Sequence, residues 1–210
     1  VIKSAFPKDG FLGEEFGEIK SKSGRRWIID PIDGTKSFIH GVPMYGVMIG
    51  LEVEKFVQVG VVNFPALGEI FYAECGSGAY CNLQRITVSA IDTISDATLC
   101  ITSEKNLRET DTLSPYTALK DRALLTRTWG DCYGHCLVAA GRAEIMIDPV
   151  MNPWDCAALV PIVEEAGGRC FDHHGEPTIY GKGFISTNAA LAPVVMEQLK
   201  STLAKPKRKI

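Results

Sequence analysis

Two aspartates on either side of a proline turn constrain this chain more than any other feature. Residues 27–38 read WIIDPIDGTKSF, so a short apolar run leads directly to Asp30, and Asp33 follows three positions later. In a straight strand the two side chains would face opposite sides of a sheet. A turn at Pro31 lets both carboxylates converge on one spot.

The chemistry of such a pair predicts a cation and phosphate site. Carboxylates held together repel one another unless a cation neutralises them, and Mg²⁺ prefers oxygen ligands of this kind. Gly34 allows close backbone approach, Thr35 is placed to cap a short helix, and their free N–H groups would hold phosphate oxygens. The same letters are also ordinary turn and cap chemistry, so this segment alone leaves a purely structural role open.

A second, distant acid favours the metal site. Asp155 stands near the start of the apolar segment 152–168, which reads NPWDCAALVPIVEEAGG. An aspartate at the start of a helix is by itself most often a cap. Its combination with the earlier pair is what points to metal-assisted chemistry.

Composition excludes several other classes of protein. The chain has 210 residues, of which 46% are hydrophobic and 22% are charged, which is sufficient for a packed core. A net charge of -3 argues against a nucleic-acid partner, and the apolar runs are too short to cross a membrane. Seven cysteines without a C-x-x-C pair are typical of reduced thiols in the cytoplasm.

Turn residues and hydrophobic periodicity predict two halves with different patterns of secondary structure. Closely spaced strands that favour an antiparallel sheet are expected at 27–29, 47–53, 56–62, 69–73 and 76–81. Later strands, which alternate with helices in the α/β manner, are expected at 97–102, 143–147, 169–171 and 183–186. The helices are expected at 133–140, 153–166 (kinked at Pro161) and 193–203, with 104–122 partly helical. A boundary at 89–96 divides the chain into an antiparallel-sheet half, 1–90, and an α/β half, 91–210.

Three segments together resemble the inositol monophosphatase superfamily. In chain order they are Gly-Glu-Glu at 13–15, Asp-Pro-Ile-Asp-Gly-Thr at 30–35, and Trp-Asp to Glu-Ala-Gly-Gly within 154–168. The resemblance covers essentially the whole of the 210 residues given. It implies an α/β fold, a layered α/β/α/β/α sandwich, and a homodimer. The N-terminal helices of the family pattern are absent from the 210 residues, so we expect that the N-terminal part is missing.

The resemblance also implies a role for each matching residue. Two or three Mg²⁺ ions per site would be bound by Glu14, Asp30, the Ile32 carbonyl, Asp33 and Asp155. Thr35 and Glu14 would orient the attacking water, with Asp33 in the catalytic set, and the Gly34 and Thr35 amides would hold the phosphate. Glu15 is expected to support these groups rather than to bind metal. The implied reaction is in-line attack of water on a phosphate monoester.

Two further acids bear on the identity of the substrate. Asp148 matches a position that contacts the substrate alcohol, and GDCY at 130–133 with LVPI at 159–162 resembles the histidinol-phosphatase branch. Asp131 and Asp148 would complement the ammonium and imidazole groups of histidinol phosphate, although Asp131 is also placed to cap the next helix. Lys36 also occurs in the sulfonucleotide-phosphatase branch, so this residue does not decide between the possible substrates.

The sequence therefore predicts a cytoplasmic histidinol-phosphate phosphatase of histidine biosynthesis. Inositol-1-monophosphate is the alternative substrate, followed by sulfonucleotides. The non-enzyme alternative is an inactive metal-binding relative.

Overall fold

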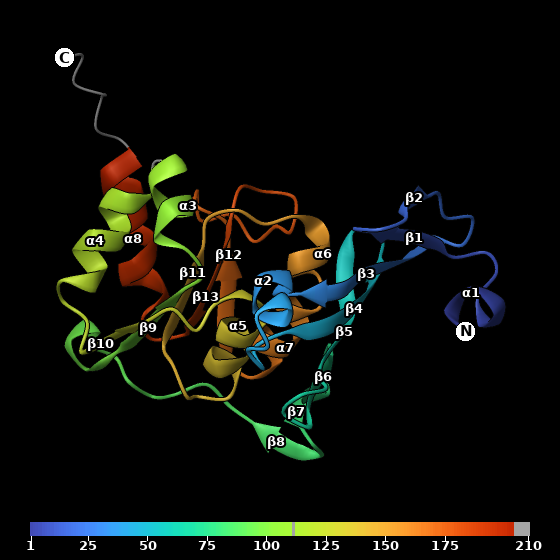
Figure 1. The fold of residues 1–210 in the computed structure, drawn as a ribbon, viewed down its shortest axis with the longest axis horizontal. Helices are drawn as coiled ribbons and strands as arrows, with labels where there is room; N and C mark the ends of the chain where they lie inside the picture. The colour runs from blue at the N-terminus through green and yellow to red at the C-terminus, as the bar shows by residue number, and fades with distance from the viewer. Residues whose placement is uncertain (111, 204–210) are drawn as a thin grey trace.

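Two β-sheets with helices on and between them make up the computed structural model, which describes residues 1–110 and 112–203 (Figure 1). The first sheet has the strand order β2-β1-β3-β4-β5-β6-β7-β8. Its strands are β1 (Gly10–Gly13), β2 (Gly17–Ile19), β3 (Arg25–Asp33), β4 (Gly46–Val53), β5 (Phe56–Phe64), β6 (Glu69–Glu74), β7 (Gly78–Cys81) and β8 (Gln84–Ile86).

The second sheet has the strand order β10-β9-β11-β13-β12. Its strands are β9 (Thr98–Ile101), β10 (Leu125–Arg127), β11 (Ile145–Asp148), β12 (Gly168–Phe171) and β13 (Phe184–Asn188). The helices are α1 (Ile2–Ala5), α2 (Thr35–Ile39), α3 (Glu104–Glu109), α4 (Leu113–Lys120), α5 (Asp131–Ala139), α6 (Pro153–Cys156), α7 (Leu159–Glu165) and α8 (Ala192–Leu203). None of the helices in the described part of the chain combines the length and apolar character needed to cross a bilayer.

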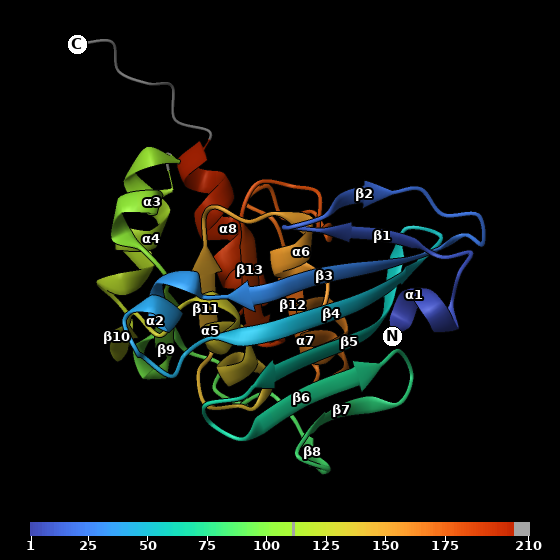
Figure 2. The ribbon, with the colours of Figure 1, turned by 45° about the vertical axis from the view of Figure 1, so that its right-hand side comes forward.

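Sheets and helices alternate in layers, as expected for the sandwich (Figures 1 and 2). Helices α5 and α7 pack against each other between the sheets, with α7 on β5, β6 and β7 and α5 on β9, β11 and β13. Side chains that alternate along β9 point to opposite layers. Leu99 and Ile101 join the cluster that includes Val195 of α8, whereas Cys100 joins Val138 of α5.

The prediction of an antiparallel first sheet is correct from β3 to β8 and wrong at β1. Strand β1 pairs with β3 in the parallel direction, and β2 then pairs antiparallel with β1 at the sheet edge. Neither strand was predicted, because GFLG and GEI are too short and too rich in glycine to show a period of two.

The turn predicted at Pro31 is instead an irregularity within a continuous strand. Strand β3 runs to Asp33, and its pairing with β4 shifts register between Asp30 and Asp33. Proline has no N–H for the ladder, so it is tolerated at such a bulge. The shift produces the expected result by another route, because it brings the two aspartates to one end of the strand.

The helix predicted at 153–166 is divided into α6 and α7. Pro161 cannot donate to the carbonyl of Ala157, and its ring crowds that carbonyl. The helix therefore breaks at Ala157 and Ala158, four and three residues before the proline. Helix α6 carries Asp155 against β3 and β4.

Candidate active site

A polar cavity of about 410 Å³ opens where β3, α2, α5, β11 and α6 meet. Segments from across the sequence contribute to its wall, from the turn after β1 to the start of α6. The cavity is lined by all nine residues that were predicted to form the site: Glu14, Asp30, Ile32, Asp33, Gly34, Thr35, Asp131, Asp148 and Asp155.

Three of the acids form a tight cluster within this cavity. One carboxylate oxygen from each of Asp30, Asp33 and Asp155 lies within 4.8 Å of the others. Glu14 lines the same cavity from the exposed hairpin turn between β1 and β2 but is not one of these three. An all-oxygen donor set of this charge fits a hard divalent cation.

Backbone amides hold each member of the cluster in place. Asp30 Oδ1 accepts a hydrogen bond from the Ile32 amide at 2.9 Å, within the bulge of β3. Asp155 Oδ2 accepts one from the Asn152 amide at 2.8 Å as part of a capping box at the start of α6. Asp155 is therefore a helix cap and also a member of the acidic cluster, so the two interpretations of this residue are compatible.

Asp33 is held from the other half of the chain. Its Oδ2 accepts a hydrogen bond of 2.6 Å from the amide of Cys132, the second residue of α5. The carboxylate thus satisfies an N-terminal N–H of a helix that begins almost a hundred residues later. This contact joins the first sheet to α5 directly at the cavity.

In the absence of a cation, burial favours the protonated forms of these acids, and neighbouring carboxylates add to this for Asp30, Asp33 and Glu14. Burial, reinforced by the charge of Asp33, raises the pKa of Asp30 to about 8. Burial, reinforced by Asp131, raises the pKa of Asp33 to about 7. The pKa of Asp155 is also raised by burial, and that of Glu14 is raised by burial and by the charge of Asp155. A bound cation would reverse these shifts because it stabilises the ionised forms.

Thr35 does not cap α2, contrary to the prediction. The N-cap position belongs to Gly34, which has a left-handed backbone (φ 77°), and a Cβ there would lie 2.8 Å from the Met44 carbonyl oxygen. Thr35 is the first residue of the helix, and its hydroxyl donates to the Ile32 carbonyl oxygen at 2.9 Å. The hydroxyl is oriented by this bond, and its oxygen can still accept a hydrogen bond from a neighbouring group.

Asp131 does not cap α5 either, so that alternative is wrong. Gly130 is the N-cap residue and Asp33 supplies the capping carboxylate, while Asp131 begins the helix with a left-handed φ of 54°. Its amide donates to Thr102 Oγ1 at 2.7 Å, and Thr102 Oγ1 in turn donates to Asp148 Oδ2 at 2.5 Å. A left-handed aspartate is an uncommon conformation that is often associated with functional sites.

Asp131 and Asp148, which line the cavity beside the three clustered aspartates, are also desolvated. Burial raises the pKa of Asp148 to about 7, and burial raises the pKa of Asp131, which the charge of Lys36 partly offsets. The cavity residues that were missed at the level of sequence include Thr102, Ser103, Asn106 and Thr128. The signal that could have found two of them is the polar pair Thr102-Ser103 directly after β9, since ligand sites often lie beyond the carboxyl ends of strands.

Comparisons with known proteins agree with this geometry. The model of the inositol monophosphatase family matches residues 1–206. The histidinol-phosphatase of Chlorobaculum parvum is 57% identical over 191 residues, which cover 90% of this chain and 74% of that protein. The fructose-1,6-bisphosphatase/inositol-1-monophosphatase of Thermotoga maritima is 36% identical over 203 residues, which cover 93% of this chain and 75% of that protein.

A solved structure shares the fold. The extragenic suppressor protein suhB from Bartonella henselae superposes with a TM-score of 0.87 at 34% identity, over 95% of this chain and 82% of that chain. The layered sheets, the acidic cavity and these similarities lead to one assignment: the chain belongs to the inositol monophosphatase family and is a phosphoric monoester hydrolase.

Proposed function

We propose that the protein hydrolyses histidinol phosphate, with Mg²⁺ bound at the acidic cluster. The observation that carries the choice of substrate is the pair Asp131 and Asp148, which lines the cavity beyond the three clustered aspartates. A neutral polyol would not need two additional desolvated acids, whereas a substrate with an ammonium group and an imidazole would pair with them. The relative from Chlorobaculum parvum, named a histidinol-phosphatase, supports the same choice.

The ligands for two or three Mg²⁺ ions would be Glu14, Asp30, Asp33, Asp155 and the Ile32 carbonyl. All five line the cavity, and hard oxygen donors are what Mg²⁺ prefers. When bound, Mg²⁺ would offset the charge of the phosphate and stabilise the charge that develops on the attacking and leaving oxygens.

The protein's own groups would position the reactants. Thr35 donates its hydroxyl proton to the Ile32 carbonyl, so its oxygen is left to accept a hydrogen bond from the attacking water. Glu14 would accept a second hydrogen bond from that water and so fix its direction. The amides of Gly34 and Thr35 would hold phosphate oxygens at the start of α2. Water held in this way attacks phosphorus opposite the alcohol that leaves.

A direct comparison of substrates tests the proposal. With Mg²⁺ present, phosphate release from histidinol phosphate should exceed release from inositol-1-monophosphate in kcat/KM by about tenfold or more, the value of one charge-assisted hydrogen bond. Asp131→Ala should selectively slow the cationic substrate. Asp121→Ala, which removes an exposed aspartate outside the cavity, should leave both rates unchanged. A strong preference of the unmodified protein for the polyol would contradict the assignment.

Inositol-1-monophosphate is the second candidate, supported by the relative from Thermotoga maritima whose name includes that activity. The proposed reaction is a step of histidine biosynthesis, which places the protein in the cytoplasm. We also propose a homodimer, which sedimentation velocity would distinguish from a monomer.

A further inference from the structure

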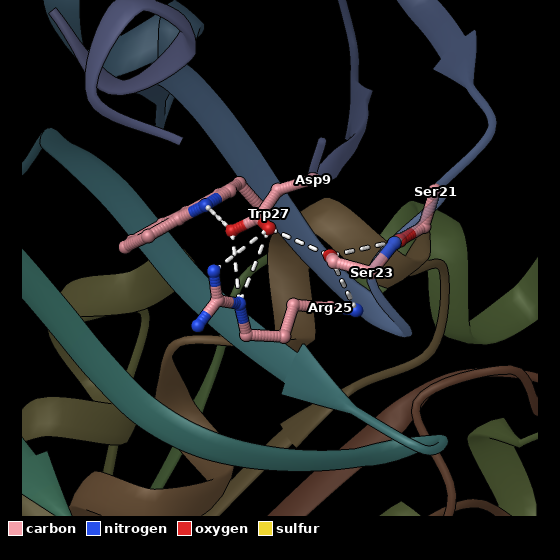
Figure 3. Close-up of polar contacts among 5 residues, drawn as sticks. All are labelled: Asp9, Ser21, Ser23, Arg25 and Trp27. Carbon is pink, nitrogen blue, oxygen red and sulfur yellow. Dashed lines mark hydrogen bonds and ion pairs between the residues drawn. The ribbon is translucent and has the colours of Figure 1, made fainter. Parts of the chain in front are cut away.

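A buried carboxylate outside the cavity closes the base of the hairpin formed by β1 and β2. Asp9 immediately precedes β1 and is only 4% exposed. Its carboxylate accepts hydrogen bonds from Ser23 Oγ at 2.6 Å, from Arg25 Nη2 at 3.0 Å and Nε at 3.1 Å, and from Trp27 Nε1 at 3.0 Å (Figure 3). We call Asp9, Ser23, Arg25 and Trp27 the Asp9 clamp.

An aromatic ring covers the Asp9 clamp. The Phe6 ring lies 5.5 Å from the ring of Trp27, between centroids, and 5.4 Å from Cζ of Arg25. The hydrogen bond from Ser23, together with those from Arg25 and Trp27, lowers the pKa of Asp9 against the opposing effect of burial. Asp9 therefore stays ionised at neutral pH, and its hydrogen bonds are charge-assisted.

The Asp9 clamp selects one register of β1 against β3. The parallel pairing sets Gly10 opposite Arg26 and Gly13 opposite Ile29, so Arg25 and Trp27 lie on either side of the residue that pairs with Gly10. A slip by two residues would keep every side chain on its own face but would move β1 by about 7 Å along β3. That slip would remove Asp9 from all three of its partners.

Little else in β1 fixes its position along the sheet. Strand β2 on its outer side is exposed throughout, and of the four residues of β1 two are glycines, while Leu12 packs on the core. Strand β3, by contrast, is anchored along its length by β4, including a salt bridge of 2.7 Å from Arg26 to Glu52. The Asp9 clamp therefore ties a weakly held strand to a firmly held one.

The register of β1 decides where Glu14 stands. Because Gly13 is opposite Ile29, the residue that follows each of them in the sequence is a predicted metal ligand, Glu14 in the turn after β1 and Asp30 on β3. The two strands also approach closely here, since a Cβ on Gly13 would lie 2.8 Å from the Ile29 carbonyl oxygen. We propose that Asp9 is a positioning residue, which sets the register of β1 and thereby holds Glu14 at the metal site.

This inference rests on the proposed function, because it takes Glu14 as a metal ligand. Two variants test it, Asp9→Asn and Arg25→Met. Arg25→Met removes the half-exposed partner and keeps the buried acid, so it guards against a failure of Asp9→Asn to fold. Glu18→Gln is the matched control, because it removes an exposed acid from the same hairpin that pairs with Arg26 and not with Asp9. Asp155→Asn tests the proposed function independently.

Three readouts separate positioning from general destabilisation. Asp9→Asn should raise the Mg²⁺ concentration for half-maximal activity by about tenfold, with kcat at saturating Mg²⁺ and KM for the substrate largely retained. Calorimetric titration with Mg²⁺ alone should show the same weakening. Amide hydrogen exchange of residues 10–14 should accelerate while exchange in β4 and β5 stays as in the unmodified protein. Arg25→Met should shift all three in the same direction by a smaller factor, and Glu18→Gln should shift none.

The two ideas fail in different ways. If Asp155→Asn abolishes hydrolysis but Asp9→Asn changes neither the Mg²⁺ affinity nor the exchange of β1, the positioning role is refuted and the proposed function stands. If Asp9→Asn lowers kcat at an unchanged Mg²⁺ affinity, its role is structural only and the inference is wrong. If the unmodified protein binds no Mg²⁺ by calorimetry, the proposed function fails and the inference fails with it.

Discussion

Asp33→Asn should make the metal-free protein more stable while it abolishes phosphate release. The carboxylate of Asp33 lies within 4.8 Å of oxygens from two other acids, so without a cation its charge lowers the free energy of unfolding. Asparagine keeps the shape of the side chain and an oxygen that can accept the 2.6 Å hydrogen bond from the Cys132 amide. The change therefore removes the charge and leaves the cap of α5 in place.

The size of the effect follows from the raised pKa. Burial and the charge of Asp131 raise the pKa of Asp33 from its ordinary value near 4 to about 7, which corresponds to roughly 4 kcal/mol of unfavourable free energy once the group is ionised. Loss of the charge-assisted character of the bond to Cys132 offsets about 1 kcal/mol of this. The free energy of unfolding should rise by about 2–3 kcal/mol at pH 8, or about 5–10 °C in Tm for a chain of this size.

The raised pKa of Asp33 also fixes how the stabilisation by Asp33→Asn depends on pH. A folded-state pKa above the unfolded value favours folding at low pH, and this advantage is lost as the pH rises through 7. The gain from Asp33→Asn should therefore be largest at pH 8 and shrink towards pH 5. Urea unfolding with a chelator present measures the stability, and phosphate release with saturating Mg²⁺ should fall by at least about a hundredfold. A variant that is less stable than the unmodified protein at pH 8, or that remains active, would refute the reasoning.

Two further predictions concern the same cavity. The metal-free protein should lose stability by on the order of 1 kcal/mol per pH unit between pH 6.5 and 8, because burial raises the pKa of Asp30 to about 8 and that of Asp148 to about 7; saturating Mg²⁺ should flatten this slope in urea unfolding. Below pH 6.5 His135 acts in the opposite direction, since burial lowers its pKa to about 3 and its protonation therefore favours the unfolded protein. Asn152→Ala removes the side chain that donates to Asp155 at 3.2 Å and should destabilise the protein by about 1 kcal/mol. The same change should weaken Mg²⁺ binding in calorimetry, and unchanged binding would show that the cap does not orient Asp155.

The sequence was sufficient to place the acids of the candidate site because they lie at the ends of recognisable elements. The apolar run before Asp30 marks a strand, and the proline near Asp155 marks the start of a helix, so both acids could be placed at element ends without knowing the fold. Their convergence in one cavity then required only that the ends of these elements meet. The Pro161 kink was equally local, because it depends on a single backbone hydrogen bond.

Two of the errors came from contacts between distant parts of the chain. The parallel pairing of β1 with β3 has no local signal, since a four-residue strand with two glycines shows no periodicity. Asp131 was considered as the cap of α5 because it is adjacent in sequence, whereas the carboxylate that accepts from the start of α5 is that of Asp33, at the end of β3. A helix start can be satisfied by any carboxylate that the tertiary fold brings near, so neighbours in sequence are only one set of candidates.

The three clustered aspartates show how a fold can hold like charges together before any cation is bound. Each uses one oxygen to accept a backbone N–H, from Ile32, Cys132 and Asn152 respectively, which fixes the side chain without neutralising it. Burial, reinforced by neighbouring carboxylates for Asp30 and Asp33, raises the pKa values of the three acids, so their protonated forms are favoured when no cation is bound. Binding of a divalent cation must then release protons, and its apparent affinity must rise with pH. Backbone amides thus set the geometry of the site, whereas its charge is balanced by whichever cation, a proton or a metal ion, is present.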